Sequence, residues 1–426
     1  MALNRDSITL GLTGSFGSGC TTLGEALVNF NFKRISLSAG IKKACTEIRK
    51  QEGRLSETEA SRRQLQDCGN KFRKTNELGY WAKDAVKEAD ALNLEGGAQI
   101  VFDGIRNCAE IEFFRTEFPN FYLIAVWCPH NHRWDRVKEK YRGNYAEFEE
   151  DDKRDADEDI EYGQQVQLCV DQADIVITND KPHSPKQAAV SALKGKIKQY
   201  IDLITGASVR PPTREEMAMA IAYATSLRSQ CLKRTVGAAI TDRNGVLIST
   251  GYNENPEPME PCIRQFEYCY KDARLKEHIH QMVEKKKECP FCKKTISNQS
   301  LVSDKYKCPH CAESLVRAYA PDRMMSRCTA IHAEQMALMN SMGRSLKDTI
   351  LFTSTFPCLQ CSRQIGYAGI KKVVYVEPYP DPDSHAFLTD FMGVSVLMFE
   401  GVKARAYQRV FNNVRRENER RYSLPT

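Results

Sequence analysis

The stretches IHAEQ (residues 331–335) and PCLQC (residues 357–361) decide how the second half of this sequence folds. His332, Cys358 and Cys361 offer three ligands to one zinc ion and leave its fourth position open for water, as in catalytic zinc sites. Both cysteines follow Pro357 at the expected start of a helix, where free N–H groups stabilise thiolates. Glu334 lies two residues after the histidine, near the metal without needing to bind it. These residues predict a zinc site at which Glu334 transfers protons.

The combination H-x-E followed by P-C-x-x-C is typical of zinc-dependent nucleobase deaminases. In that chemistry a hydroxide attacks C4 of cytosine, the glutamate protonates N3 and then the leaving amine, and ammonia departs. The alternative is a closed zinc site or a chance match. The expected elements argue against it, because helices over 331–342 and 357–369 flank a strand over 348–355 and carry the two halves of the motif.

The surrounding elements predict an α/β/α domain. A helix is expected over 214–229, and a β-hairpin over 235–253 turns at Asn244–Gly245, a pair typical of tight hairpins. Further elements are expected as a strand over 371–379, a helix over 386–393 and a strand over 394–401.

From about residue 214 to residue 400 the sequence resembles the deoxycytidylate deaminase family. The matching stretches are RSQCLKRTVGAAI, STGYNENP, CTAIHAEQMAL, TSTFPCLQC and GIKKVVYVEPY. The resemblance implies a cytidine-deaminase-like fold, deoxycytidine nucleotides as substrates, and substrate contacts from Asn253 and, more weakly, Tyr379. Two departures bear on which phosphate form is preferred: Met336 stands where the family usually has asparagine, and an unusually long insertion precedes the histidine.

The insertion, from Pro256 to about Asp322, is polar and rich in cysteine. Its core, about residues 286–314, contains CPFC and CPHC, a C-x2-C-x15-C-x2-C spacing typical of a zinc ribbon. Four cysteines suit a closed structural zinc site, which supplies folding free energy that so few apolar residues cannot. These predicted ligands are Cys289, Cys292, Cys308 and Cys311. Cys231 and Cys262 also match cysteines that bind a second zinc in some relatives; the candidates to complete that site are Cys269, His278 and His280.

The first half contains GLTGSFGSGCTT (residues 11–22), which fits the phosphate-binding pattern G-x-x-x-x-G-K-[ST] except that Cys20 replaces the lysine. Continuous apolar strands alternate with helices, which predicts a parallel sheet covered on both faces. Asp103 ends one strand and is the candidate ligand for Mg²⁺ accompanying a nucleoside triphosphate. The expected nucleotide-binding residues are Gly14, Gly17, Gly19, Cys20, Thr21, Thr22 and Asp103.

Residues 8–205 resemble P-loop nucleotide kinases, through the glycine loop, VFDGIRNCAEIEFFR and QADIVITND. Backbone N–H groups bind phosphate without a lysine, but Cys20 places no cation at the γ-phosphate. We therefore expect retained nucleotide binding with lost kinase activity. Arginines offer an alternative source of cations: Arg133, Arg136, Arg142 and Arg154. The acidic segment over 144–163 is expected to be a lid or surface loop.

These patterns divide the chain into a P-loop domain over 1–205, a linker over 206–213, and a deaminase domain over 214–426 with the inserted ribbon. The 426 residues support two domains, and the net charge of +6 suits nucleotide phosphates without indicating a nucleic-acid protein. The 16 cysteines, many of them clustered, favour metal binding in a reducing compartment. No apolar run spans a membrane and no signal organisation opens the sequence, so we expect a cytoplasmic protein.

The pairing of a P-loop domain with a deaminase domain resembles bacterial anti-phage dCTP deaminases. That resemblance implies hydrolysis of the C–N bond to the amino group of cytosine in dCTP or dCMP, which depletes the cytosine nucleotide pool. It also implies regulation through the P-loop domain or by a small inhibitory RNA. It also implies a homo-oligomer. Two alternatives stay open: an RNA or DNA cytidine or adenosine deaminase, which needs stacking aromatics and a basic track, and a nucleotide sensor with a decayed catalytic site.

Overall fold

The computed structural model describes residues 4–52, 60–92, 99–156, 158, 160–180, 186–301, 306–321, 327–378 and 382–412. The chain forms two compact units. Unit 1 contains residues 1–216 and returns to include 398–426, and unit 2 contains residues 217–397. No described helix combines the length and the apolar composition that a membrane span requires.

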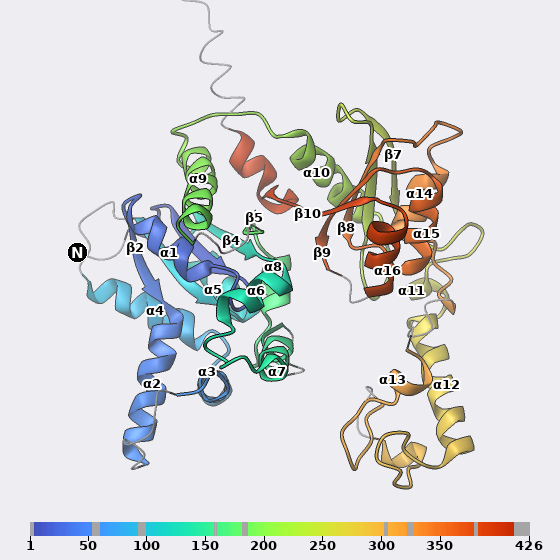
Figure 1. Ribbon diagram of the computed structural model, residues 1–426, viewed down its shortest axis with the longest axis horizontal. Coiled ribbons are helices and arrows are strands. Elements are labelled where there is room, and N and C mark those ends of the chain that lie inside the picture. The colour runs from blue at the N-terminus through green and yellow to red at the C-terminus, as the bar shows by residue number, and fades with distance from the viewer. Residues whose placement is uncertain are drawn as a thin grey trace, which may run out of the picture. The chain divides into compact units, whose positions relative to one another are not determined.

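Unit 1 is built on a six-stranded sheet with the order β11-β5-β4-β1-β3-β2 among the described residues (Figure 1). Five strands are parallel, and β11 pairs antiparallel with β5 at one edge. The strands are β1 (Thr9–Thr13), β2 (Phe32–Ser36), β3 (Gln99–Ile105), β4 (Phe121–Trp127), β5 (Ile175–Thr178) and β11 (Gly401–Val402). The helices are α1 (Cys20–Val28), α2 (Leu37–Gln51), α3 (Arg62–Thr75), α4 (Tyr80–Ala91), α5 (Cys108–Glu117), α6 (His130–Val137), α7 (Tyr145–Ala156), α8 (Val166–Asp171) and α9 (Lys186–Thr205).

Helices cover both faces of this sheet, as the continuous apolar strands predict. One face buries Leu10 and Leu12 of β1 against apolar side chains of α1 and α9. On the other face Phe102 of β3 stacks on Phe114 of α5, with ring centroids 4.4 Å apart, and Phe114 stacks in turn on Phe121 of β4. The expected α/β unit with a parallel sheet is therefore present.

The C-terminal segment completes unit 1 rather than unit 2, which differs from the expected assignment of residues 214–426 to one domain. After β10 (Ser395–Met398), the chain enters unit 1, where β11 pairs with β5. Residues 404–412 then form a helix that lies beside α9 (Figure 1), and its apolar side chains join the core that also contains side chains of α9. A local reading of the sequence cannot detect this return, because the pairing joins residues more than 220 positions apart.

The acidic segment over 144–163 is not a loop along residues 145–156, because these form α7, while its expected role as a lid stays a prediction. Phe148, Asp151 and Asp155 recur at helical spacing and are buried. Arg62 and Arg106, from distant elements, pair with Asp155. Acidic residues of α7 therefore form ion pairs with arginines that are distant in the sequence, and the composition of the segment alone does not predict these pairs.

Unit 2 is built on a five-stranded sheet with the order β10-β9-β8-β6-β7 among the described residues. Its hairpin of β6 (Gly237–Thr241) and β7 (Leu247–Tyr252) is antiparallel and turns at Asn244–Gly245, as predicted, while β8 (Ile350–Thr355) and β9 (Lys372–Glu377) are parallel. The helices are α10 (Arg214–Ser226), α11 (Cys262–Gln265), α12 (Tyr270–Lys286), α13 (Val316–Tyr319), α14 (Ala333–Met339), α15 (Leu359–Tyr367) and α16 (Pro382–Ala386), which continues as a π-helical turn over Phe387–Phe391.

Two glycines allow helices to approach both faces of this sheet closely. A Cβ atom on Gly237 would lie 1.9 Å from the carbonyl oxygen of Ala222 in α10, and one on Gly251 would lie 2.2 Å from that of Ala333 in α14. Because Gly251 pairs with Ala238, Gly251 and Gly237 face opposite sides of the hairpin. The result is the expected α/β/α arrangement, with α14 seated directly on β7.

Candidate active site

Two helix starts bring the motif residues together. His332 precedes α14 as its N-cap, and its backbone N–H donates to Gln335 Oε1 at 3.0 Å. Cys358 is the N-cap of α15, and Cys361 lies in the first turn of that helix. Since α14 and α15 pack on the same side of the sheet, the three side chains converge.

The donor set fits a zinc ion. His332 Nδ1 lies 3.2 Å from Cys361 Sγ and 3.4 Å from Cys358 Sγ, and all three ligand atoms lie within 4.8 Å of one another. Tetrahedral zinc with ordinary Zn–N and Zn–S bonds separates such atoms by roughly 3.6 Å. The three residues therefore need only a slight expansion to hold the ion, and Glu334 lies beside them.

Glu334 is buried beside these ligands. Oε2 of Glu334 accepts a hydrogen bond from Cys361 Sγ at 3.7 Å, and Glu334 is 4% exposed. Burial raises the pKa of Glu334 to about 7, so that the carboxyl group can both accept and donate a proton near neutrality.

The pKa values of the two thiols are shifted in opposite directions. Hydrogen bonds from Cys361 and His332 lower the pKa of Cys358 to about 4, which keeps it a thiolate at neutral pH. The same interaction raises the pKa of Cys361. Metal binding would displace the remaining proton from Cys361, as thiolate ligation requires.

Of the two residues expected to contact substrate, Asn253 is described by the structure and hydrogen-bonds within its own chain. Asn253 is 8% exposed, and both ends of its amide bind one loop: Oδ1 accepts from the Val236 N–H at 2.7 Å, and Nδ2 donates to the Arg234 carbonyl at 2.8 Å. Asn253 thus fixes the loop before β6. Tyr379 lies outside the described residues.

Comparison with known proteins assigns the region that carries this site. Residues 212–377 match the family model of the cytidine and deoxycytidylate deaminase zinc-binding region. They form a domain homologous to hydrolytic dCMP deaminases. A deoxycytidylate deaminase of Schizosaccharomyces pombe is 29% identical over 211 residues, which cover 49% of this chain and 48% of that protein. The chain therefore spans about half of the length of this relative.

A solved structure shows a similar protein with its ligands. The dCMP deaminase of cyanophage S-TIM5, in complex with dCMP and dUMP, is 22% identical, covers 45% of this chain and 99% of its own, and has a TM-score of 0.27.

The N-terminal region has a different relative. A UPF0200 protein of Thermococcus kodakarensis is 26% identical over 192 residues, which cover 44% of this chain and 96% of that protein. The first half of the chain thus resembles UPF0200 proteins, and the name of that relative gives no activity.

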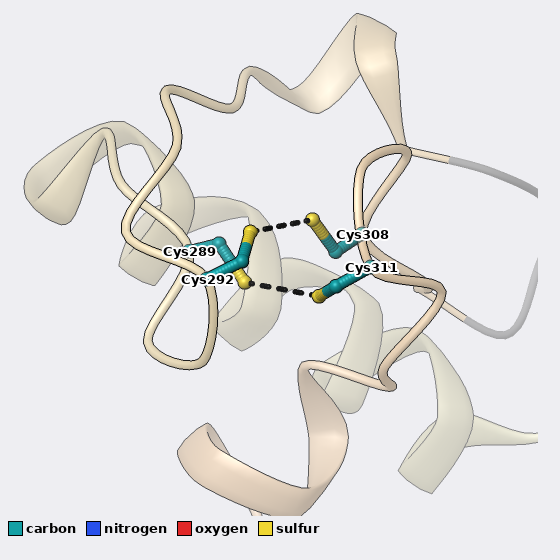
Figure 2. A group of neighbouring side chains, drawn as sticks. All are labelled: Cys289, Cys292, Cys308 and Cys311. Atoms are coloured by element: carbon teal, nitrogen blue, oxygen red, sulfur yellow. Dashed lines mark hydrogen bonds between the residues drawn. The ribbon is translucent and has the colours of Figure 1, made fainter.

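The ribbon cysteines form a second donor set. Two similar turns present them, at Cys289–Lys294 and Cys308–Glu313, each closed by a hydrogen bond from the first cysteine N–H. Figure 2 shows the four side chains pointing toward one another, with Cys289 Sγ and Cys292 Sγ each 3.8 Å from a partner, Cys311 Sγ and Cys308 Sγ respectively. Tetrahedral zinc bound by four thiolates requires sulfur separations of about 3.8 Å. The four residues fit a structural zinc ion, and they pack with the apolar face of α12.

The glycine loop joins β1 to α1, as in a phosphate-binding loop. Two residues expected to contact the nucleotide or its magnesium ion, Cys20 and Asp103, are buried or paired within the protein. Burial raises the pKa of Cys20 to about 12, so the thiol is neutral and supplies no charge. Asp103, the expected magnesium ligand, is buried and accepts two hydrogen bonds from Arg34, at 2.5 and 3.1 Å. Thr21 is exposed and Thr22 is half-buried.

Arginines surround the loop, but two of those expected to face a phosphate bind the loop itself. Arg133 Nη1 donates to the Phe16 carbonyl, and Arg136 Nη1 donates to the Gly17 and Ser18 carbonyls. Arg154 pairs with acidic side chains instead. The sequence does not predict the pairing of Arg34 with Asp103, because the two residues are 69 positions apart and no local pattern connects them.

Proposed function

We propose that this chain is a zinc-dependent hydrolytic deaminase of deoxycytidine nucleotides, converting dCMP, dCTP or both to the uracil forms with release of ammonia. The observation that carries the proposal is the convergence of His332, Cys358 and Cys361 beside the buried carboxyl of Glu334. The match to the deaminase zinc-binding region supports the same chemistry.

Each residue then has a defined task. His332, Cys358 and Cys361 would hold the zinc ion, which when bound lowers the pKa of a water molecule toward about 7. Glu334 accepts one proton from the attacking water and delivers it to N3 of the cytosine ring while the water oxygen bonds to C4. It then takes the remaining O–H proton of this adduct and passes it to the amine, so that the bond from C4 to the amine breaks and ammonia departs. Burial of Glu334 excludes bulk water from these transfers.

The substrate and biological role form the finer part of the proposal. The resemblance to bacterial anti-phage dCTP deaminases supports dCTP as a substrate and depletion of the cytosine nucleotide pool as the outcome. Unit 1 would then be regulatory, binding a nucleotide at residues 14–22 without kinase activity or responding to a small inhibitory RNA. The neutral thiol of Cys20 supports the absence of phosphoryl transfer.

Self-association is also part of the proposal. Met339, Met342 and Tyr367 are exposed on and beside α14 and α15, next to an apolar groove of about 640 Å³. Such a face is typical of an interface. Sedimentation velocity of the purified chain should detect a homo-oligomer, and a monomer at all concentrations would contradict this part.

Ammonia release from a panel of substrates tests the activity. We expect turnover of dCMP or dCTP, and none of single-stranded DNA or RNA. Glu334→Gln should lower kcat by about 10²–10⁴-fold because the proton carrier is lost. Its zinc content should match that of the parent, since Glu334 is not a ligand.

Three results would each contradict a part of the proposal. Activity confined to polynucleotides would favour the nucleic-acid deaminase, and binding without turnover would favour a sensor. If cellular dCTP stays constant when the parent chain is expressed, compared with Glu334→Gln, the role in pool depletion fails while the deaminase assignment is unaffected.

A further inference from the structure

A guanidinium group lies beside the glycine loop of unit 1, which has a cysteine in place of its lysine. Thr13, the last residue of β1, pairs with Ile105, the last residue of β3, so Arg106 leaves the sheet next to the start of the loop. Arg106 is also close enough to Cys20 to interact electrostatically with its thiol. Arg106 can therefore supply the cation that Cys20 cannot.

A second guanidinium group reaches the same loop from α3. The Cζ atom of Arg62 lies 3.9 Å from the centroid of the Phe16 ring, and Phe16 belongs to the loop. Arg62 and Arg106, the arginine pair, both donate hydrogen bonds to the carboxylate of Asp155, in the last turn of α7 beside α3 (Figure 1). Asp155 is 1% exposed, and Gln66 of α3 also donates to it, at 2.6 Å. The chain thus places an anion of its own on the arginine pair.

The arginine pair has more donors than this single carboxylate satisfies. Each guanidinium group carries five N–H donors, and within the described ranges Asp155 is the only carboxylate that forms an ion pair with either group. Nε of Arg62 is buried and has no hydrogen-bond partner in the part of the chain that the structure describes. Asp151, one helical turn earlier in α7, attracts Arg62, but its carboxylate accepts a hydrogen bond from the Tyr141 hydroxyl at 3.0 Å. A phosphate dianion, with more oxygens and more charge, would satisfy the pair more fully.

The two guanidinium groups also repel each other. Burial, and next the charge of Arg106, lowers the pKa of Arg62 to about 9. The nearby Arg34 and Arg73 each have an ion-pair partner of their own, a carboxylate that neither member of the arginine pair shares. The arginine pair is therefore the part of this cluster that an added anion would stabilise.

We propose that the arginine pair binds the terminal phosphate of a nucleotide held at residues 14–22, and that Asp155 occupies this phosphate site until the nucleotide displaces it. The carboxylate and a phosphate exclude each other, because two anions at one buried point repel strongly. Displacement breaks the hydrogen bonds that hold Asp155, so the last turn of α7 loosens when the nucleotide binds. The inference rests on the nucleotide-binding part of the proposed function and is independent of the deaminase reaction.

Hydrogen–deuterium exchange of the full parent chain, followed on peptides within residues 145–156, tests the displacement. ATP at saturation should accelerate exchange in α7 by at least about fivefold, because the turn that carries Asp155 opens more often. Adenosine, which lacks phosphate, and inorganic phosphate at the same concentration should leave the exchange unchanged.

The results that overturn the proposal are separable from failure of the proposed function. If equilibrium dialysis shows bound ATP while exchange in α7 is slower or unchanged, the proposal fails and nucleotide binding by unit 1 stands. If inorganic phosphate alone accelerates exchange equally, the site binds a free anion and the proposal fails as well. If ATP does not bind, this inference and the regulatory role of unit 1 both fail, whereas ammonia release from dCMP or dCTP still tests the deaminase.

Substitutions measure the competition directly, by equilibrium dialysis with ATP. Asp155→Asn removes the competing charge and should tighten binding by at least about tenfold, and Arg106→Gln should weaken it by a similar factor. The matched control is Glu150→Gln, which breaks the exposed ion pair with Arg63 between the same two helices and should leave the affinity unchanged. Equal or weaker binding by a folded Asp155→Asn variant would overturn the proposal. If that variant does not fold, exchange in the parent chain still decides.

Discussion

At the scale of single residues, the position of Glu334 determines how the proposed reaction depends on pH. Burial raises its pKa to about 7, and the carboxylate is the form that accepts the first proton. A bound zinc ion nearby lowers that pKa, so the acid limb of kcat/KM is expected at or below pH 7, with activity rising as pH increases through it.

A pH–rate profile with dCMP or dCTP checks this expectation. A profile that falls as pH rises from 5 to 7 would mean that Glu334 does not act as the base. Zinc content measured across the same range is the control, because protonation of His332 or the thiols releases metal.

Also at this scale, the sequence indicates the residue types of the active site but not their partners. H-x-E and P-C-x-x-C suffice to predict the donor set, because each half lies within one short segment. Asp103 shows the opposite case: its expected role as a magnesium ligand stays a prediction, and its pairing with Arg34 depends on the contact between β2 and β3.

At the scale of elements, the turn from β1 into α1 depends on Gly19. Its φ of 111° lies in the region that favours glycine, and a Cβ atom would lie 2.5 Å from Asn179 Nδ2. Gly19→Asp should therefore distort the loop and weaken binding of ATP or dCTP to unit 1 by at least about tenfold.

Equilibrium dialysis with each nucleotide and the full chain measures the effect. The matched control is Gly195→Asp in α9, where an added Cβ meets nothing within 4 Å. Unchanged nucleotide affinity in Gly19→Asp would mean that residues 14–22 do not bind phosphate.

Glu216 joins three elements at the end of unit 1. Its carboxylate accepts hydrogen bonds from both terminal nitrogens of Arg210, at 2.7 and 3.0 Å, from the Thr213 N–H at 2.8 Å and from the Val402 N–H at 3.0 Å. Glu216→Gln should lower the free energy of unfolding by about 2 kcal/mol, because a buried charge-assisted network loses its acceptor. Urea denaturation, with exposed Glu25→Gln as control, measures it.

The contribution of Glu216 also has a definite pH dependence. Burial alone would raise its pKa, but the hydrogen bonds outweigh burial and lower the pKa below the ordinary value of 4.5. A depressed pKa means that the stabilisation is complete above pH 4.5 and is lost as pH falls through the folded-state pKa. The stability difference between the parent and Glu216→Gln should shrink below pH 4.5; a constant difference would contradict this.

At the scale of the whole molecule, the chain inserts unit 2 between two parts of unit 1. Val402, Ala406 and Val410 are buried in the core of unit 1, although they follow unit 2 in the sequence. Val410→Asp should therefore destabilise unit 1 by about 3 kcal/mol or more, because it buries an unpaired charge.

Limited proteolysis shows which of the two units the Val410→Asp substitution destabilises. Cleavage within residues 1–205 should accelerate in Val410→Asp but not in Gln408→Asp, which alters an exposed position of the same helix. Accelerated cleavage confined to residues 217–397 would contradict the assignment of this segment to unit 1.

The sequence by itself determined the α/β class of both halves, the hairpin at Asn244–Gly245, and the members of the two groups of side chains that could hold a metal ion. These signals are local: periodicity, turn pairs and cysteine spacing act over a few residues. Only the tertiary structure decided that Arg34 pairs with Asp103, that the acidic α7 folds onto arginines, and that residues 398–412 complete unit 1. Each of these depends on segments that are distant in sequence and brought together by burial of apolar surface, which no local pattern encodes.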